Sequence, residues 1–132
     1  MIIRASQLVV PLDNKPGTLA NLCSVLGRAQ VNIIGVFAPE AKGKGLVRVM
    51  VLDVPAARAA LKGAKIKFSE EEVLDVELDN RPGAFGELLG KLAKAKINVG
   101  QAYATTAPFA RARVVIEVPD AAKALAVLGQ HS

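Results

Sequence analysis

The strongest constraint on this chain is that its sequence repeats itself. Residues 12–33 and 78–99 align without a gap and are identical at nine of 22 positions. Each segment opens with Leu-Asp-Asn-Lys/Arg-Pro-Gly and contains a second Asn near its end. Beyond these segments the offset between the copies falls from 66 to 64, which pairs Pro55 with Pro119 and Leu61 with Leu125. An internal repeat of this kind means that one small structural unit has been built twice.

Each copy is predicted to contain a strand, a helix, two strands, a helix and a strand. Apolar, β-branched runs predict the strands, and apolar residues three or four positions apart predict the helices. The expected strands are 7–12, 33–38, 46–52, 64–68, 73–78, 98–105 and 111–118, with a turn over 106–110. The expected helices follow Gly17 and Gly83, or run over about 55–62 and 119–128.

This order of elements is the split βαβ pattern of ferredoxin-like folds. We therefore expect an α+β protein of two βαββαβ units, each with two helices on one face of an antiparallel sheet, and with the sheets joined side by side. The predicted division is a first domain over residues 1–69 and a second over 70–132. Only four residues follow Leu128, so the last strand of the second domain is short or missing, and residues 1–5 or a second chain could fill that edge.

The composition limits the class of protein. With 52% hydrophobic and 22% charged residues the chain should fold. The single cysteine, Cys23, leaves no intramolecular disulfide or cysteine-based metal site, and its place in an apolar helical stripe predicts burial. No apolar run approaches the ~20 residues of a membrane helix, so we expect a cytoplasmic protein without membrane contact. The acidic run 69–72 is expected to be a solvated connector.

The net charge of +5 suggests a nucleic-acid partner, but other features argue against one. The basic residues are scattered, as on a solvated face. Segments 46–52 and 111–118, which would carry the stacking aromatics of an RNA-recognition fold, contain none. The sequence also offers no Ser/His/Asp set, Cys–His pair or metal cluster, so we expect a protein that is not an enzyme and has no cofactor.

The two repeated loops are the candidate functional sites. Each joins a predicted strand to a predicted helix, where free backbone N–H groups and the helix dipole favour an anion such as a carboxylate. Glycine lets a ligand approach closely, proline presets φ, and the Asp carboxylate either binds an ammonium group or caps the helix. The candidate residues are Asp13, Asn14, Pro16 and Gly17 in the first loop and Asp79, Asn80, Pro82 and Gly83 in the second.

The repeated pattern of an apolar strand, Asp-Asn-Lys/Arg-Pro-Gly, a helix and Val-Asn-Ile or Ile-Asn-Val resembles the ACT domain, a small regulatory module of amino-acid metabolism. The resemblance covers nearly the whole chain, as a tandem pair without a catalytic domain. It implies a sheet order of 4-1-3-2 in each unit. It also implies units paired through their second strands into an eight-stranded sheet, and a small ligand, usually an amino acid, bound between units near the first loop.

The resemblance also implies particular ligand contacts. In ACT domains of the serine-binding type, an Asn in the first loop and the Asn that begins the second strand touch the ligand. In this chain these are Asn14, Asn32, Asn80 and Asn98. For Asn32 and Asn98 the alternative is a turn residue that tolerates left-handed backbone after a helix. That type also has a His two residues before the loop Asn, where this chain has Leu12 and Leu78, so serine itself is not specified.

The sequence therefore predicts a non-catalytic regulatory protein that binds a free amino acid at the interface between ACT units. The ligand would favour one arrangement of those units, and a regulated enzyme would respond to that arrangement. We expect a homo-oligomer, most simply a dimer, because the second unit is short. The alternative is an RNA-binding or protein-interaction module on the same ferredoxin-like topology.

Overall fold

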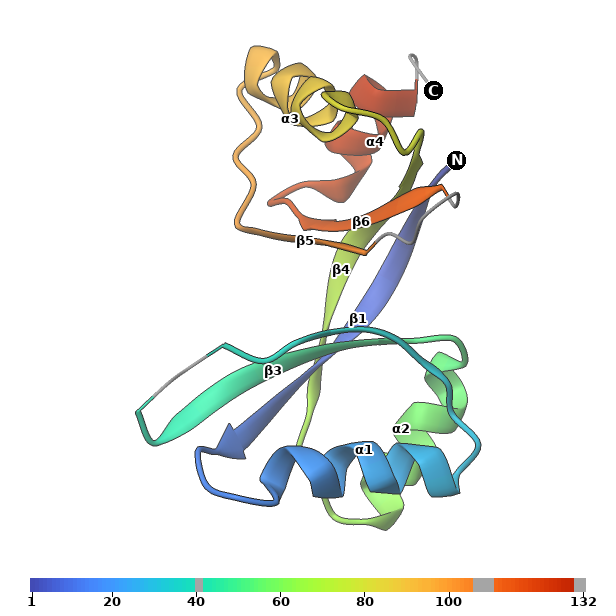
Figure 1. Ribbon diagram of the computed structural model, residues 1–132, viewed down its shortest axis with the longest axis vertical. Helices are drawn as coiled ribbons and strands as arrows, with labels where there is room; N and C mark the ends of the chain where they lie inside the picture. Colours follow the sequence, from blue (N-terminus) through green and yellow to red (C-terminus); the bar gives the residue numbers. More distant parts are fainter. Residues whose placement is uncertain (40–41, 106–110, 130–132) are drawn as a thin grey trace. The chain divides into compact units, whose positions relative to one another are not determined.

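A computed structural model describes residues 1–39, 42–105 and 111–129 of the chain (Figure 1). The elements in chain order are β1 (Ile2–Asp13), α1 (Thr18–Arg28), β2 (Ile33–Phe37), β3 (Lys44–Val51), α2 (Val54–Gly63), β4 (Ser69–Leu78), α3 (Ala84–Lys94), β5 (Gln101–Thr105), β6 (Ala112–Glu117) and α4 (Ala121–Gly129). The strands have the hydrogen-bonded order β2-β3-β1-β4-β6-β5. The predicted α+β, ferredoxin-like class is confirmed, while the predicted turn over 106–110 lies outside the described residues.

The chain forms two compact units that do not correspond to a single cut in the sequence. The first unit consists of residues 6–71, and the second consists of residues 1–5 together with residues 72–132. β1 and β4 therefore each begin in one unit and end in the other. The boundary predicted between residues 69 and 70 lies inside β4.

Residues 1–5 take the fourth-strand position of the second unit. The carbonyl oxygen of Met1 accepts a hydrogen bond of 2.8 Å from the backbone N–H of Glu77. Both units thus have the order 4-1-3-2 that the resemblance implied, with the end of one shared strand as strand 1 of the unit and the start of the other as strand 4. β2 and β5 stand at the two ends of the strand order, so the expected eight-stranded sheet joined through these second strands is wrong for this chain.

The fourth strand of the first unit comes from the acidic run. The predicted strand over 64–68 is wrong, because residues 66–68 have no regular structure and β4 begins at Ser69. The solvated connector expected over 69–72 is also wrong, because these residues start β4. Arginine partners make a strand of glutamates tolerable, since charge-assisted hydrogen bonds offset desolvation. The pairs are Glu70 with Arg58 at 2.7 Å, Glu71 with Arg48 at 2.9 Å and Glu72 with Arg4 at 2.8 Å.

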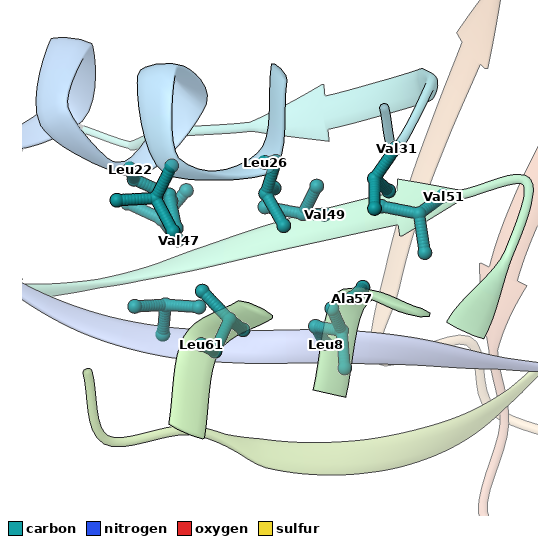
Figure 2. Close-up of a cluster of buried hydrophobic side chains, with 11 residues drawn as sticks. Leu8, Leu22, Leu26, Val31, Val47, Val49, Val51, Ala57 and Leu61 are labelled. Atoms are coloured by element: carbon teal, nitrogen blue, oxygen red, sulfur yellow. The ribbon is translucent and has the colours of Figure 1, made fainter. Parts of the chain in front are cut away.

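The core of each unit lies between two helices and one face of its strands. Figure 2 shows this cluster in the first unit, where Leu22 and Leu26 of α1 and Leu61 of α2 point toward the side chains of β1 and β3. These three leucines are fully buried, and each such burial stabilises the fold by about 1.5–3 kcal/mol. The second unit has a corresponding cluster: Leu74, Val76, Leu88, Leu92, Ile97, Val114, Ile116, Val118, Ala121, Ala124 and Leu128.

Helices α2 and α4 are equivalent in the two copies, and their equivalent residues are 67 positions apart in sequence. The offset of 64 expected from the sequence is therefore wrong. Asp53 and Asp120 each accept a hydrogen bond of 3.0 Å at Oδ1 from the backbone N–H three residues later. Leu61 therefore corresponds to Leu128, which is buried, and not to Leu125, which is half-buried. The capping carboxylate and the buried helix face determine this register, while the prolines that suggested 64 occupy different positions in the two copies.

Cys23 is exposed on α1, so its predicted burial is wrong. The helix buries Leu22, Val25 and Leu26 instead. An α-helix has 3.6 residues per turn, so the residue directly after Leu22 lies about 100° around the helix and falls outside the buried face.

Candidate functional site

The two repeated loops have the same backbone structure. Gly17 and Gly83 are the N-cap residues of α1 and α3, with φ of 92° and 88°. Their carbonyl oxygens each accept a hydrogen bond of 2.9 Å, from the backbone N–H of Asn21 and Glu87 respectively. A left-handed φ of this size strains any residue with a Cβ, which is the physical reason for glycine at both positions.

Neither helix start receives a side-chain cap. No side chain hydrogen-bonds to the N-cap region of α1 or α3, so the alternative that Asp13 and Asp79 cap the helices is wrong. Thr18 stabilises the first loop from within, because its hydroxyl donates to the carbonyl oxygens of Asp13 at 2.7 Å and Lys15 at 3.2 Å. The second loop has Ala84 at the position of Thr18 and lacks these bonds. Uncapped N–H groups in a first helical turn are available to an anionic partner.

A shallow pocket of about 350 Å³ lies against the first loop. Its polar lining comes from Asp13, Asn14, Lys15 and Thr18. Its apolar lining comes from the aliphatic residues Leu12, Leu19, Ala38, Pro39 and Val47. The side chains of Asp13 and Lys15 are largely solvent-exposed, and Lys15 Nζ lies 4.0 Å from Asp13 Oδ2. The pocket thus offers a carboxylate with only a distant ion-pair partner beside an aliphatic wall.

The pocket at the second loop, about 220 Å³, has a different polar lining. Arg111 contacts Asp79 at 2.9 Å and Glu77 at 2.6 Å, so both carboxylates share one guanidinium. Arg81 pairs with Glu87 at 2.6 Å, and this hydrogen bond holds the pKa of the Glu87 carboxyl below its usual value. All three carboxylates that line this pocket are therefore engaged by arginine.

The remaining predicted site residues line neither pocket. Pro16 and Pro82 are exposed in the loops. Asn32 and Asn98 are exposed between the end of one helix and the next strand, and the carbonyl oxygen of Asn32 accepts a hydrogen bond of 3.0 Å from the backbone N–H of Leu52. At about 3.3 Å per strand residue, roughly 20 Å or more separates them from the loop asparagines.

The alternative role suggested for Asn32 and Asn98 is not observed either. Among the described residues other than glycine, only Gln30, Lys65 and Lys96 have positive φ. The left-handed turn after α1 therefore falls on Gln30, and the one after α3 falls on Lys96. Neither asparagine has the backbone conformation that a helix-terminating residue of that kind requires.

Sequence reasoning missed Thr18, Leu19, Glu87 and Arg111 as parts of these pockets. Glu87 and Thr18 could have been identified from the sequence, because each lies in the first turn of a predicted helix. Arg111 was not, because it approaches Asp79 across the β4–β6 ladder, where Leu78 pairs with Ala112. That contact joins residues 32 positions apart in sequence through strand pairing, which no local pattern determines.

Within the described ranges, no group of three His, Cys, Asp or Glu side chains is placed to hold a metal ion. Among the helices of those ranges, none has the length and apolarity needed to cross a membrane.

Comparison with known proteins places the chain among pairs of ACT domains. Residues 1–127 match the family model described as an ACT domain pair. No curated protein matches the chain. Protein BT0572 from Bacteroides thetaiotaomicron is similar over 98% of this chain and 89% of its own, with 28% identity and a TM-score of 0.90.

Two more distant similarities concern aspartate kinases. The regulatory subunit of aspartate kinase from Thermus thermophilus, in its ligand-free form, has 16% identity and a TM-score of 0.66 over 98% of this chain and 95% of its own. Aspartokinase III from E. coli, in complex with lysine and aspartate, has 15% identity and a TM-score of 0.58 over 98% of this chain and 32% of its own. At these identities the similarity shows the fold alone.

Proposed function

Because this chain belongs to the ACT domain family, as an ACT domain pair over residues 1–127, we propose that it is a non-catalytic regulatory protein that binds a free α-amino acid at its repeated loops. The observation that carries the proposal is the pair of uncapped helix starts, each preceded by an Asp of the loop. An α-amino acid carries a carboxylate and an ammonium group a few ångströms apart. The first-turn N–H groups suit the carboxylate, and the Asp side chain suits the ammonium group.

The proposed contacts are those of the loops: Asp13, Asn14, Pro16, Gly17, Asp79, Asn80, Pro82 and Gly83. Contacts of the ligand with Asn32 and Asn98 stay predictions. A ligand held at the loop of the same unit would not reach these two side chains. The location between ACT units, a homodimer and a regulated enzyme as partner also stay predictions. The aspartate kinase similarities support a regulatory role in general, and the E. coli structure contains two amino acids.

A binding screen tests the proposal directly. The full chain is melted with each of the twenty amino acids, and those that raise the melting temperature are measured by calorimetry, since binding to the folded form stabilises it. We expect at least one dissociation constant below about 1 mM, or about −4 kcal/mol. The double variant Asp13→Asn/Asp79→Asn should lose this binding. Glu70→Gln, which removes a carboxylate elsewhere in the first unit, should keep it.

Failure of all twenty amino acids to bind would contradict the proposal. Binding of single-stranded RNA that weakens with salt would favour the alternative RNA-binding module instead. β3 and β6 contain no aromatic residue for base stacking, so we expect no such binding.

A further inference from the structure

We propose that the two loops have diverged, so that only the first binds the amino acid, and that this amino acid has an aliphatic side chain. The inference rests on the amino-acid-binding function proposed above and adds the site and the ligand class. It comes from a contrast between two loops whose backbones are the same and whose side-chain pairing is not.

The charged groups of the second loop are already engaged in ion pairs. An ammonium group at Asp79 would compete with Arg111, which contacts Asp79 Oδ1 at 2.9 Å and Glu77 at 2.6 Å. A ligand carboxylate would meet the Glu87 carboxylate in the first turn of α3. Glu87 lies in that first turn as an anion paired with Arg81, so a ligand carboxylate would compete with it for the helix start and for the same arginine.

The first loop has none of these obstacles. Asn21 occupies the position of Glu87, so the first turn of α1 contains no acidic residue. Lys44 lies across the ladder from Asp13, in the place that Arg111 takes in the second unit. Among the described residues Lys44 forms no ion pair, and the only ion pair of Asp13 is the long one with Lys15, at 4.0 Å. The Asp13 carboxylate can therefore accept a ligand ammonium without breaking a close ion pair.

The lining of the first pocket indicates the side chain of the ligand. Five of its residues are aliphatic, and Leu19 keeps 39% of its surface exposed. Covering such surface with an aliphatic group is favourable, by about fourfold in affinity for each buried methylene. The charged groups of this pocket, Asp13 and Lys15, lie in the loop that would hold the ligand backbone. An amino acid with a charged side chain would find no separate partner among the aliphatic residues.

Calorimetry with defined probes tests both parts of the inference. The probes are L-leucine and L-valine, with glycine as the bare zwitterion and L-lysine and L-aspartate as charged competitors. We expect one L-leucine per chain, bound at least tenfold more tightly than glycine or either charged amino acid. Two sites per chain, or a preference for L-lysine or L-aspartate, would overturn the inference.

Matched variants locate the site. Asn21→Glu, which gives α1 the acidic residue that α3 has, should weaken L-leucine binding at least tenfold, and Asp13→Asn should weaken it by a similar factor. Glu70→Gln should not change it, and circular dichroism checks that each variant is folded. Unchanged binding in folded Asn21→Glu and Asp13→Asn would overturn the assignment to the first loop. If no amino acid binds the unmodified chain, the proposed function itself fails, which is a distinct result.

Discussion

A chain that begins at Ser6 should lose stability mainly in its second unit. Residues 1–5 belong to that unit although they precede the first unit in sequence. The deletion removes the hydrogen bond from Glu77 to the Met1 carbonyl, worth about 1 kcal/mol net. It also removes the half-buried Ile2 side chain, which packs against the second core and contributes about 1 kcal/mol. The pair of Arg4 and Glu72 is exposed, so its loss adds little.

The expected total is therefore about 2 kcal/mol, a large share of the 5–15 kcal/mol by which a typical domain is stable. Native-state hydrogen exchange is the suitable assay, because it reports the two units separately. Amides of residues 73–78 and 112–117 should lose protection more than amides of residues 46–51. The control Arg4→Gln removes only the exposed ion pair and should leave the protection of both units close to that of the unmodified chain. No loss on deletion, or a loss centred on residues 6–71, would refute the shared-strand arrangement.

Three further outcomes follow from the described contacts. Leu128→Ala should cost about 2–5 kcal/mol in urea denaturation and Leu125→Ala clearly less, because only the first is fully buried; equal costs would contradict the register of 67. Lys96→Gly should stabilise the chain by up to about 1 kcal/mol, since lysine has φ of 58° there, and a lower melting temperature would contradict this. The hydrogen bond from Arg58 lowers the pKa of the Glu70 carboxyl in the folded chain. The pair therefore stabilises the fold at pH values above the unfolded pKa of Glu70, and this contribution is lost as the pH falls through the folded pKa. Glu70→Gln should flatten the acid limb of a stability–pH curve by no more than about 1 kcal/mol, and an unchanged limb would contradict this.

Local features of the fold could be predicted because short-range physics determines them. Gly17 and Gly83 signal left-handed turns at helix starts, and the apolar spacing after each predicts a helix that buries one face. The order of strands within each unit followed from the repeat and its resemblance to a known family. Cys23 shows the limit of this reasoning, because a residue one position from a buried leucine still faced solvent.

The exchange of strands between the units could be predicted only in part: residues 1–5 were one of two candidates for the edge of the second unit, whereas the strand that residues 69–71 give to the first unit was not expected. Residues 69–72 are acidic and look like a connector, but they begin a strand beside β1, and three of them pair with arginines up to 68 positions away in sequence. Pairing across such distances depends on the folded arrangement rather than on local propensity. By composition, the apolar run over 64–68 resembles a strand more than residues 69–72 do. In the structure it belongs to the connection after α2, where Ile66 and Phe68 pack against the first core.

The same distinction governs what a repeated motif says about ligands. Asp13 and Asp79 are identical residues on equivalent backbone, yet one has a lysine at 4.0 Å and the other an arginine at 2.9 Å. The motif determines the backbone, since glycine and proline act through their own φ values. The charged side chains that differ between the two loops come from β3, from the residue before β6 and from the first helical turn, where Lys44, Arg111 and Glu87 stand outside the motif. Two copies of one loop thus keep the same backbone while the ion pairs of their aspartates differ, and the proposed difference in ligand binding rests on those outside residues rather than on the shared ones.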